Sequence, residues 1–274
     1  MDAPSKLAEG VVRLGTPLVN WYLVADESGI TVVDAGLPKY RPQLEPGLEL
    51  LGRPASDIRA IALTHTDADH IGVAEELRAE LGVPVYVHPD DRATALKPKP
   101  KKTDGSFFPH LLHGAAYQLF WHMTLNGVKP KPIAEVTTYA GGKGVAGGGG
   151  GGGEAGWGGE AGGGGEAGGE GEVDIPGRPT VIPTPGHTPG HVALHFPAHG
   201  ALFVGDLICT WNPMTGRRGP QLFPRALNTD SPRSRKSLSA IEPLAADLVL
   251  PGHGEPYEGS PRDAAAEALA TGPS

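Results

Sequence analysis

Four ionisable side chains lie within six consecutive residues, and they are of the types that bind metal ions. They are His65, Asp67, Asp69 and His70. Imidazole and carboxylate groups each offer a lone pair to a cation, and the cation offsets the repulsion between neighbouring carboxylates. The simpler alternative is a solvated carboxylate that caps a helix, with incidental histidines. A turn with a purely structural role does not need four ionisable side chains, so we predict a metal site here.

The segments on either side of this cluster place it between a strand and a helix. Residues 58–63 are mostly apolar and indicate a buried strand, whereas residues 73–81 have helical spacing and good helix formers. Similar groups follow the predicted strands further along the chain. They are His187 with His191, then Asp206, then His253. The end of a strand is where a rigid scaffold presents ligands, so these residues are further candidates for the same site.

The residue pattern in the rest of the chain predicts strands followed by helices, and this arrangement occurs twice, once in each half of the chain. Strands are expected at 11–14, 18–25, 30–34, 83–88, 180–182, 192–196, 201–204 and 248–250, and helices at 40–51, 90–96, 107–125, 231–244 and 261–270. Residues 97–102, rich in lysine and proline, are expected to form a solvated loop or an anion-attracting lid over the site. A polar loop is expected at 212–225. The segments 97–125 and 211–225 are expected to form the substrate pocket.

Residues 141–171 differ in kind from the rest, because 20 of these 31 residues are glycine. A segment with so little to bury cannot offset its chain entropy, so a flexible insertion in a surface loop is expected. Its GxGxxG strings follow no strand and open no helix, which excludes a dinucleotide-binding site. The predicted organisation is one domain over residues 1–274 that this insertion interrupts.

Composition narrows the class of function. The 274 residues include 23 Lys and Arg against 31 Asp and Glu, a net charge of −8, which argues against general nucleic-acid binding. The single cysteine, Cys209, excludes an intrachain disulfide. Residues 1–9 lack the apolar core of a signal peptide, and no apolar run reaches membrane-spanning length. We therefore expect a cytoplasmic protein that acts on a small molecule, without a nucleic-acid or membrane partner.

Taken together, the motifs resemble those of the metallo-β-lactamase-fold hydrolases. Five landmarks follow the family's order: Asp34 in Val-Asp-Ala-Gly, the cluster at 65–70, His187 in Pro-Gly-His-Thr-Pro-Gly-His, Asp206 after Leu-Phe-Val-Gly, and His253 in Pro-Gly-His-Gly. The resemblance covers nearly the whole chain apart from the insertion, and it is strongest to the glyoxalase II-like branch. It implies an α/β fold, a four-layer αββα sandwich of two mixed β-sheets with outer helices, with a metal site along one edge.

The same resemblance implies a role for each residue of the site. Site one would use His65, Asp67 and His187, site two would use Asp69, His70 and His253, Asp206 would bridge both, and Asp34 and His191 would support the ligands from behind. The implied cofactors are two divalent metal ions, zinc in the first place, with iron or manganese as alternatives. His88, His195 and His199 match no ligand position.

Asp67 departs from the family pattern, which has a histidine at that position. Aspartate also ligates metals, and we expect Asp67 to do so. Two divalent ions with two aspartates leave a charge of +2, a third aspartate leaves +1, and a hydroxide then makes the site neutral. Less positive charge acidifies bound water less, and oxygen donors favour harder metals. Our hypothesis is a less zinc-selective site with a more alkaline pH optimum than an all-histidine counterpart.

The reaction implied is the hydrolysis of a thioester, a lactone or another carboxylic ester by a metal-bound hydroxide. Asp69 would act as the catalytic carboxylate that orients the hydroxide and shuttles its proton. Two alternatives remain. His65, His187 and Asp206 alone form the ligand set of non-haem iron oxygenases, as in persulfide dioxygenases. The chain would otherwise be a non-catalytic binder of a metal or ligand, with Asp67 marking a degraded site.

Overall fold

The computed structural model describes residues 2–106, 108–110, 113–139 and 171–272. The predicted glycine-rich insertion, apart from Gly171, lies outside the described residues. Within the described part of the chain, the strands form a seven-stranded sheet, a six-stranded sheet and a separate two-stranded ribbon. None of the helices in this part of the chain has both the length and the apolar character needed to cross a bilayer.

The first sheet is built from the N-terminal part of the chain. Its strands lie in sequence order, antiparallel from β1 to β4 and parallel from β4 to β7. These strands span Ser5–Ala8, Val11–Thr16, Val19–Asp26, Gly29–Val33, Ile58–Ala62, Val85–Val87 and Thr137–Thr138. The central strand β4 is buried on both faces, as expected for a sheet that is covered on both sides.

The second sheet is built from the C-terminal part and has the order β15-β14-β11-β10-β9-β8, with β11 and β14 parallel. In chain order, β8, β9, β10, β11, β14 and β15 span Gly171–Glu172, Thr180–Pro183, Val192–Phe196, Ala201–Gly205, Leu248–Pro251 and Tyr257–Glu258. The ribbon pairs β12, Ile208–Trp211, with β13, Arg218–Leu222.

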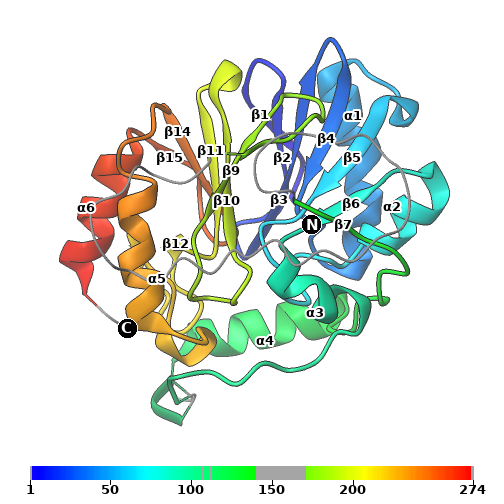
Figure 1. Cartoon of the computed structure of the whole chain (residues 1–274). Helices are drawn as coiled ribbons and strands as arrows, with labels where there is room; N and C mark the ends of the chain where they lie inside the picture. Colours follow the sequence, from blue (N-terminus) through cyan, green and yellow to red (C-terminus); the bar gives the residue numbers. More distant parts are fainter. Residues whose placement is uncertain (1, 107, 111–112, 140–170, 273–274) are drawn as a thin grey trace.

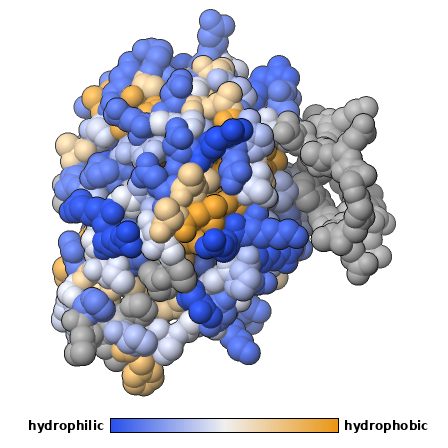
Figure 2. Space-filling model, turned by 90° about the vertical axis from the view of Figure 1, so that its left-hand side faces the viewer, coloured by the Kyte–Doolittle hydropathy of each residue, from blue (hydrophilic) through white to orange (hydrophobic). Residues whose placement is uncertain are grey.

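Helices lie outside both sheets, and α3 and α4 lie at one end of them (Figure 1). The helices α1 to α6 span Leu44–Leu51, Ala74–Leu81, Arg92–Leu96, Gly114–Asn126, Ser231–Ser237 and Pro261–Thr271. Helices α1 and α2 cover the first sheet, and α6 covers the second (Figure 1). The surface on the α6 side is largely hydrophilic, with an apolar group near the middle of the view and smaller apolar areas elsewhere (Figure 2).

Three apolar clusters fill the spaces between these layers. In the first, Leu44 of α1 and Leu77 of α2 pack against the outer face of the first sheet. The second lies between the two sheets and joins Tyr22 of β3 to Phe203 of β11, whose ring centroids are 5.0 Å apart. In the third, α6 packs its small residues, among them Ala265, against the second sheet. Helix, sheet, sheet and helix are thus stacked in order, which confirms the predicted αββα sandwich.

Three predicted helices differ from the structure, and local chemistry explains one of the differences. The helix expected at 40–51 begins as a 3₁₀ helix, Pro38–Gln43, because Pro42 supplies no N–H to the helix. The helix expected at 231–244 ends as an α-helix at Ser237 and continues as a 3₁₀ helix, Leu238–Ala240. The helix expected at 107–125 starts only at Gly114, after an extended His113.

The loop expected at 212–225 contains strand β13, and this prediction was also wrong. Strand β13 forms because Leu222 pairs with Ile208 and Gln221 pairs with Cys209 on β12. The strand includes Pro220, which a sequence pattern assigns to a loop or a sheet edge. Pairing with the preceding strand β12 therefore overrode the signal of the segment itself.

Candidate metal centre

Two groups of potential ligand atoms meet where strands of both sheets end. His65 follows β5, His187 follows β9 and Asp206 follows β11, and one ligand atom from each lies within 4.8 Å of the others. A second group consists of Asp69, His70 and His253, with the same mutual separation. The two groups therefore contain six of the seven residues that the sequence suggested as ligands, and the seventh, Asp67, lies beside the first group.

Asp206 lies between the two groups. Its Oδ2 is 3.4 Å from Nε2 of His187 and 3.4 Å from Nε2 of His253. Its Oδ1 is 3.5 Å from Nε2 of His70, and its Oδ2 is 3.7 Å from Nε2 of His65. One carboxylate thus faces the lone pairs of all four histidines, the arrangement expected of a ligand shared by two ions.

Several polar atoms of the centre are buried without a hydrogen-bond partner among the described residues. They are Nε2 of His65, Nε2 of His70 and Oδ1 of Asp206. A buried polar atom without a partner costs about 1–3 kcal/mol, so such atoms are rare unless something else satisfies them. Imidazole nitrogens and carboxylate oxygens that face one another fit divalent cations, and the residues present therefore fit the metal ions that the sequence implied.

The other ring nitrogen of each histidine fixes which nitrogen faces the centre. Nδ1 of His70 donates to Oδ2 of Asp34 at 2.9 Å, and Nδ1 of His187 donates to Oδ1 of Asn228 at 3.0 Å. Nδ1 of His253 donates to the carbonyl of Leu18. These contacts leave the Nε2 lone pairs directed inward, as metal ligation by histidine requires.

Asp34 supports both groups from behind. Its Oδ1 accepts from the N–H of Thr64 at 2.8 Å, and its Oδ2 accepts from the Thr64 hydroxyl at 2.9 Å. That hydroxyl in turn accepts from Nδ1 of His65 at 3.0 Å. Asp34 follows β4 with φ +57°, a left-handed conformation that aspartate tolerates better than most residues. The side chain of one buried residue is therefore linked to His65 and, directly, to His70.

The loop that carries His253 is held by the first sheet. Asn20 of β3 donates from Nδ2 to the carbonyl of Pro251 at 3.0 Å and to that of Gly254 at 2.7 Å. Position 252 must be glycine, because a Cβ there would lie 2.5 Å from Oδ1 of Asp206. Both sheets thus take part in positioning one ligand.

The loop that carries His187 is held by two buried side chains. Nδ1 of His191 donates to the Thr184 hydroxyl at 2.8 Å, while its Nε2 accepts from the N–H of Asp206 at 3.0 Å. Asp91 accepts from the Thr188 hydroxyl at 2.7 Å and from the N–H of Gly190 at 2.9 Å. His191 therefore supports the backbone and does not face the ligand atoms of either group.

A family model decides which class of protein has this centre. The model of the metallo-beta-lactamase superfamily matches residues 14–253. This chain belongs to the metallo-beta-lactamase superfamily. The match includes every residue that the sequence suggested for the site, from Asp34 to His253.

Two relatives are named as probable metallo-hydrolases. Probable metallo-hydrolase YflN of Bacillus subtilis (strain 168) is 23% identical over 264 residues, which cover 92% of this chain and 86% of the relative. Probable metallo-hydrolase YybB of the same organism is 21% identical over 250 residues, which cover 89% of this chain and 84% of the relative. The chain is therefore similar along most of its length to proteins named as metallo-hydrolases.

Solved structures show the same fold. A HARLDQ motif mutant of a metallo-beta-lactamase from Cronobacter sakazakii superposes with a TM-score of 0.63 at 20% identity, covering 99% of this chain and 95% of that one. A metallo-beta-lactamase family protein from Thermus thermophilus gives a TM-score of 0.60 at 22% identity, covering 97% and 80%. At these identities the likeness establishes the fold alone.

Asp67, where the chain departs from the superfamily motif, is in neither group of ligand atoms. Its Oδ2 lies 2.9 Å from Nε2 of His187 and 4.0 Å from Nε2 of His65, and its side chain is 27% exposed. The same oxygen accepts a hydrogen bond from Nζ of Lys101. Burial would raise the pKa of Asp67, but the ammonium of Lys101 and the His187 imidazole hold it well below its usual range.

The other groups of the centre also shift one another's pKa values. Burial would lower the pKa of His70, but the carboxylates of Asp206 and Asp34 raise it to about 10. Burial would raise the pKa of Asp206, but the imidazoles of His253 and His70 hold it well below its usual range. Burial and the neighbouring His70 keep the pKa of His65 well below 6.5. The carboxylates thus create a field that attracts cations, while His65 stays neutral and able to ligate.

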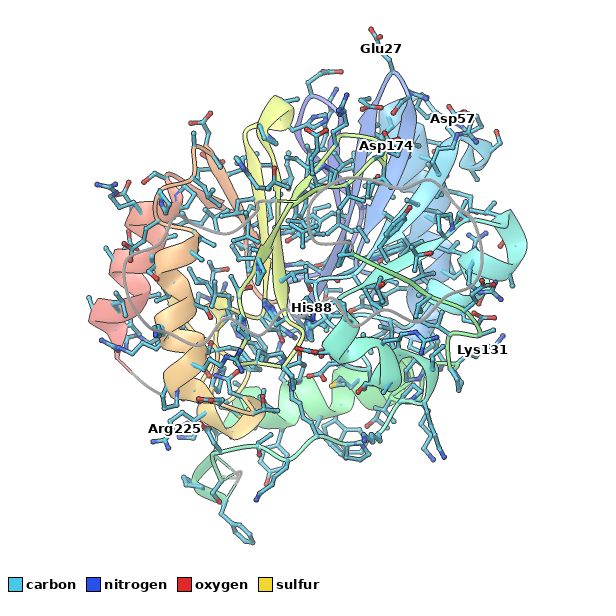
Figure 3. All side chains as sticks on the ribbon, in the orientation of Figure 1. Glu27, Asp57, His88, Lys131, Asp174 and Arg225 are labelled. Atoms are coloured by element: carbon cyan, nitrogen blue, oxygen red, sulfur yellow. The ribbon has the colours of Figure 1, made fainter. Side chains whose placement is uncertain are left out.

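A cavity of about 650 Å³ opens over the centre. Asp69, Asp206 and His253 lie in its wall, and its remaining lining is mostly apolar: Pro98, Pro100, Leu119, Met123, Val128, Pro130, Pro132, Phe223 and Leu227. Lys99, Lys101 and Lys129 add positive charge. The predicted pocket loops thus contribute, but so do residues 128–132, which the sequence did not suggest. Arg225 is exposed, lies at the edge of the molecule (Figure 3), and does not line the cavity.

The histidines that matched no ligand position lie outside both groups of ligand atoms. His195 contacts the carbonyl of Ala245 at 2.9 Å, and His199 contacts that of Glu9 at 3.1 Å. His88 lies nearer the middle of the molecule (Figure 3), and its Nδ1 accepts from the N–H of Asp90. Four residues that the sequence did not single out contact the ligands or hold their loops. They are Lys101, Asp91, Asn228 and Asn20.

Proposed function

We propose that the protein is a metal-dependent hydrolase that uses two divalent ions and cleaves a thioester, a lactone or another carboxylic ester. The observation that carries this proposal is the convergence of unpartnered lone pairs on Asp206 from both groups. Site one would be held by His65 and His187, with Asp67 beside them, and site two by Asp69, His70 and His253. Asp206 would be shared.

When bound, the metal ions would supply a Lewis acid for the substrate carbonyl and an acidified water as nucleophile. The protein's own residues supply position and proton transfer. The Asp69 carboxylate lies in the cavity wall, with Oδ2 3.5 Å from Nε2 of His253. From there it can accept a hydrogen bond from the attacking water and take up its proton, the role of a general base.

The cavity lining supports an ester with an apolar portion. The apolar side chains around the opening favour an acyl or aliphatic group, and the lysines favour a substrate that also has an anionic group. The glyoxalase II-like motif around His187 is the reason to include thioesters. Zinc is the metal we propose first, and the Asp67 carboxylate is the reason to include iron and manganese.

One observation favours a second candidate function. His65, His187 and Asp206 form a closed group of two imidazoles and one carboxylate, which is the ligand type of mononuclear non-haem iron oxygenases. A single iron held by these residues would favour a persulfide dioxygenase-like activity. The second group at Asp69, His70 and His253 has no place in that reaction, so we rank the hydrolase first.

Metal content and turnover test the two functions together. The purified protein would be analysed by elemental mass spectrometry and then assayed on thioester, lactone and carboxylic-ester panels. We expect two divalent ions per chain, ester turnover, and a loss of about 100-fold or more in kcat in Asp69→Asn. This variant would be assayed with metal in excess, because Asp69 is also a proposed ligand of site two. His195→Gln is the matched control, because His195 lies outside both groups. One iron per chain with oxygen consumption and no ester turnover would overturn the hydrolase.

A further inference from the structure

Lys101 reaches into the centre from a segment that the superfamily motifs do not include. Its Nζ donates to Oδ2 of Asp67 and lies 2.7 Å from Nε2 of His187. Nδ1 of His187 donates to Asn228, so the Nε2 that faces Lys101 presents a lone pair. The ammonium therefore contacts the atom through which His187 would bind a metal.

Lys101 brings a positive charge to two atoms that can accept hydrogen bonds. Oδ2 of Asp67 and Nε2 of His187 are both acceptors, and they lie only 2.9 Å apart. Two acceptors at this distance repel unless positive charge lies beside them, and the Lys101 ammonium supplies that charge. A metal ion at site one would serve the same two atoms, so the ammonium and the metal have overlapping positions.

Comparison with the other lysines of the cavity shows that this arrangement is specific. Lys99 and Lys129 line the same cavity, but neither has a hydrogen bond or ion pair with another described residue. Lys101 makes both of its contacts with atoms of site one, and its side chain is only 20% exposed. At site two, no lysine or arginine of the described chain contacts Asp69, His70 or His253.

We propose that Lys101 is a built-in competitor of the metal at site one, so that the protein binds its two ions with unequal affinity. Site two fills first, and site one fills only when the incoming ion displaces the ammonium from Asp67 and His187. The inference rests on the proposed two-metal centre, although not on which bond the enzyme cleaves. Asp67 then has two roles, as partner of Lys101 in the metal-free protein and as neighbour of the metal in the loaded one.

Metal titration of the full-length protein tests this inference without an activity assay. Metal-free protein would be titrated with Co²⁺, and the binding steps followed by absorption and by calorimetry. We expect two steps in the wild type, the second at least about tenfold weaker. Lys101→Met, which keeps the length of the side chain without its charge, should strengthen the second step by about tenfold and leave the first unchanged.

Two further variants keep the test decisive. Lys101→Gln removes the charge but keeps a polar end, and it should behave like Lys101→Met. Lys99→Met removes a neighbouring cavity charge and should leave both steps as in the wild type. Equal affinity for both ions in the wild type, or an unchanged second step in both Lys101 variants, would overturn the proposal. No Co²⁺ binding by any of the proteins would instead refute the proposed metal centre itself.

Discussion

Site two is held from behind by buried groups, whereas site one is reached by a lysine from a loop. At site two, His70 donates to Asp34, which is 2% exposed, and His253 donates to the carbonyl of Leu18. At site one, Lys101 contacts Asp67 and its side chain is partly exposed. The histidines of site one also have buried supports, Thr64 behind His65 and Asn228 behind His187, so the two sites differ in the Lys101 contact.

The difference shows how one fold can give two neighbouring metal sites different affinities and different ease of metal exchange. Buried hydrogen bonds to the outer nitrogen of a histidine fix its tautomer and orientation, and such partners change metal affinity by about 10–100-fold. A side chain on an exposed loop opens at much lower free energy than a sheet does. In the proposed two-metal centre, we therefore expect the ion at site two to exchange more slowly than the ion at site one, where the Lys101 ammonium competes.

Substitution of Asp206 should prevent metal binding at both sites. We expect Asp206→Ala to lose both ions, because its two oxygens face the Nε2 atoms of both groups. The loss of ester turnover should exceed the about 100-fold typical of partners that only orient ligands. Elemental mass spectrometry and the ester panel check this result, with the exposed Asp174→Asn as control. Retention of two ions would show that Asp206 is not shared.

Asp34→Asn should weaken site two more than site one. Asparagine tolerates the left-handed φ of +57° at this position, so the backbone is retained while the charge opposite His70 is lost. We expect the affinity of the first Co²⁺ step to fall by about 10–100-fold. An equal fall in the Co²⁺ affinity of both steps would contradict the expected difference between the sites. It would indicate that Asp34 acts mainly through Thr64 and His65.

Asn228→Ala should weaken site one alone. Its Oδ1 accepts from Nδ1 of His187 at 3.0 Å, and a neutral amide supports a ligand less strongly than a carboxylate does. We therefore expect the second Co²⁺ step to weaken by about tenfold, the lower end of the range for such partners. Asn228→Asp, which restores a charged acceptor, should reverse the effect. A change in the first step instead would contradict this assignment.

The sequence predicted most of the centre because its motifs are local signals, whereas the sandwich was implied by the resemblance to the superfamily that these motifs carry. Each of His65, His187, Asp206 and His253 follows a short apolar run, and the end of a strand is fixed by that run. The order of the motifs then distinguished this family from others, although each motif alone was less specific. The structure adds that these strand ends come from two sheets and meet at one edge.

The position of Lys101 in the centre could not be predicted from the sequence. Lys101 lies among other lysines at 97, 99 and 102, and nothing in residue type distinguishes it from them. Its position depends on how the segment crosses the cavity, which is set by contacts with distant parts of the chain. Asp91 was hidden for the same reason, because its partners Thr188 and Gly190 lie almost a hundred residues away.

Asp91 gives the smallest expected effect, because it supports the loop of His187 and no ligand directly. Burial raises the pKa of Asp91 above the usual 3.8, although the Thr188 hydroxyl and the N–H of Gly190 oppose this shift. The folded protein then holds this proton more tightly than the unfolded chain does. The corresponding stability is fully present below pH 3.8 and is lost as the pH rises through the folded-state pKa.

Two substitutions separate the charge of Asp91 from its hydrogen bonds. In Asp91→Asn the amide oxygen can accept from the N–H of Gly190, and the amide nitrogen can donate to the Thr188 hydroxyl. The loss of stability with rising pH should therefore vanish. At pH 7 the free energy of unfolding should equal or exceed that of the wild type. Asp91→Ala leaves both partners buried and unpaired, which should cost about 1–3 kcal/mol. Urea unfolding at pH 4 and pH 7 measures both. If Asp91→Asn were as unstable as Asp91→Ala at pH 7, the negative charge itself would be what holds the loop, and the same charge would then belong in the electrostatics of site one.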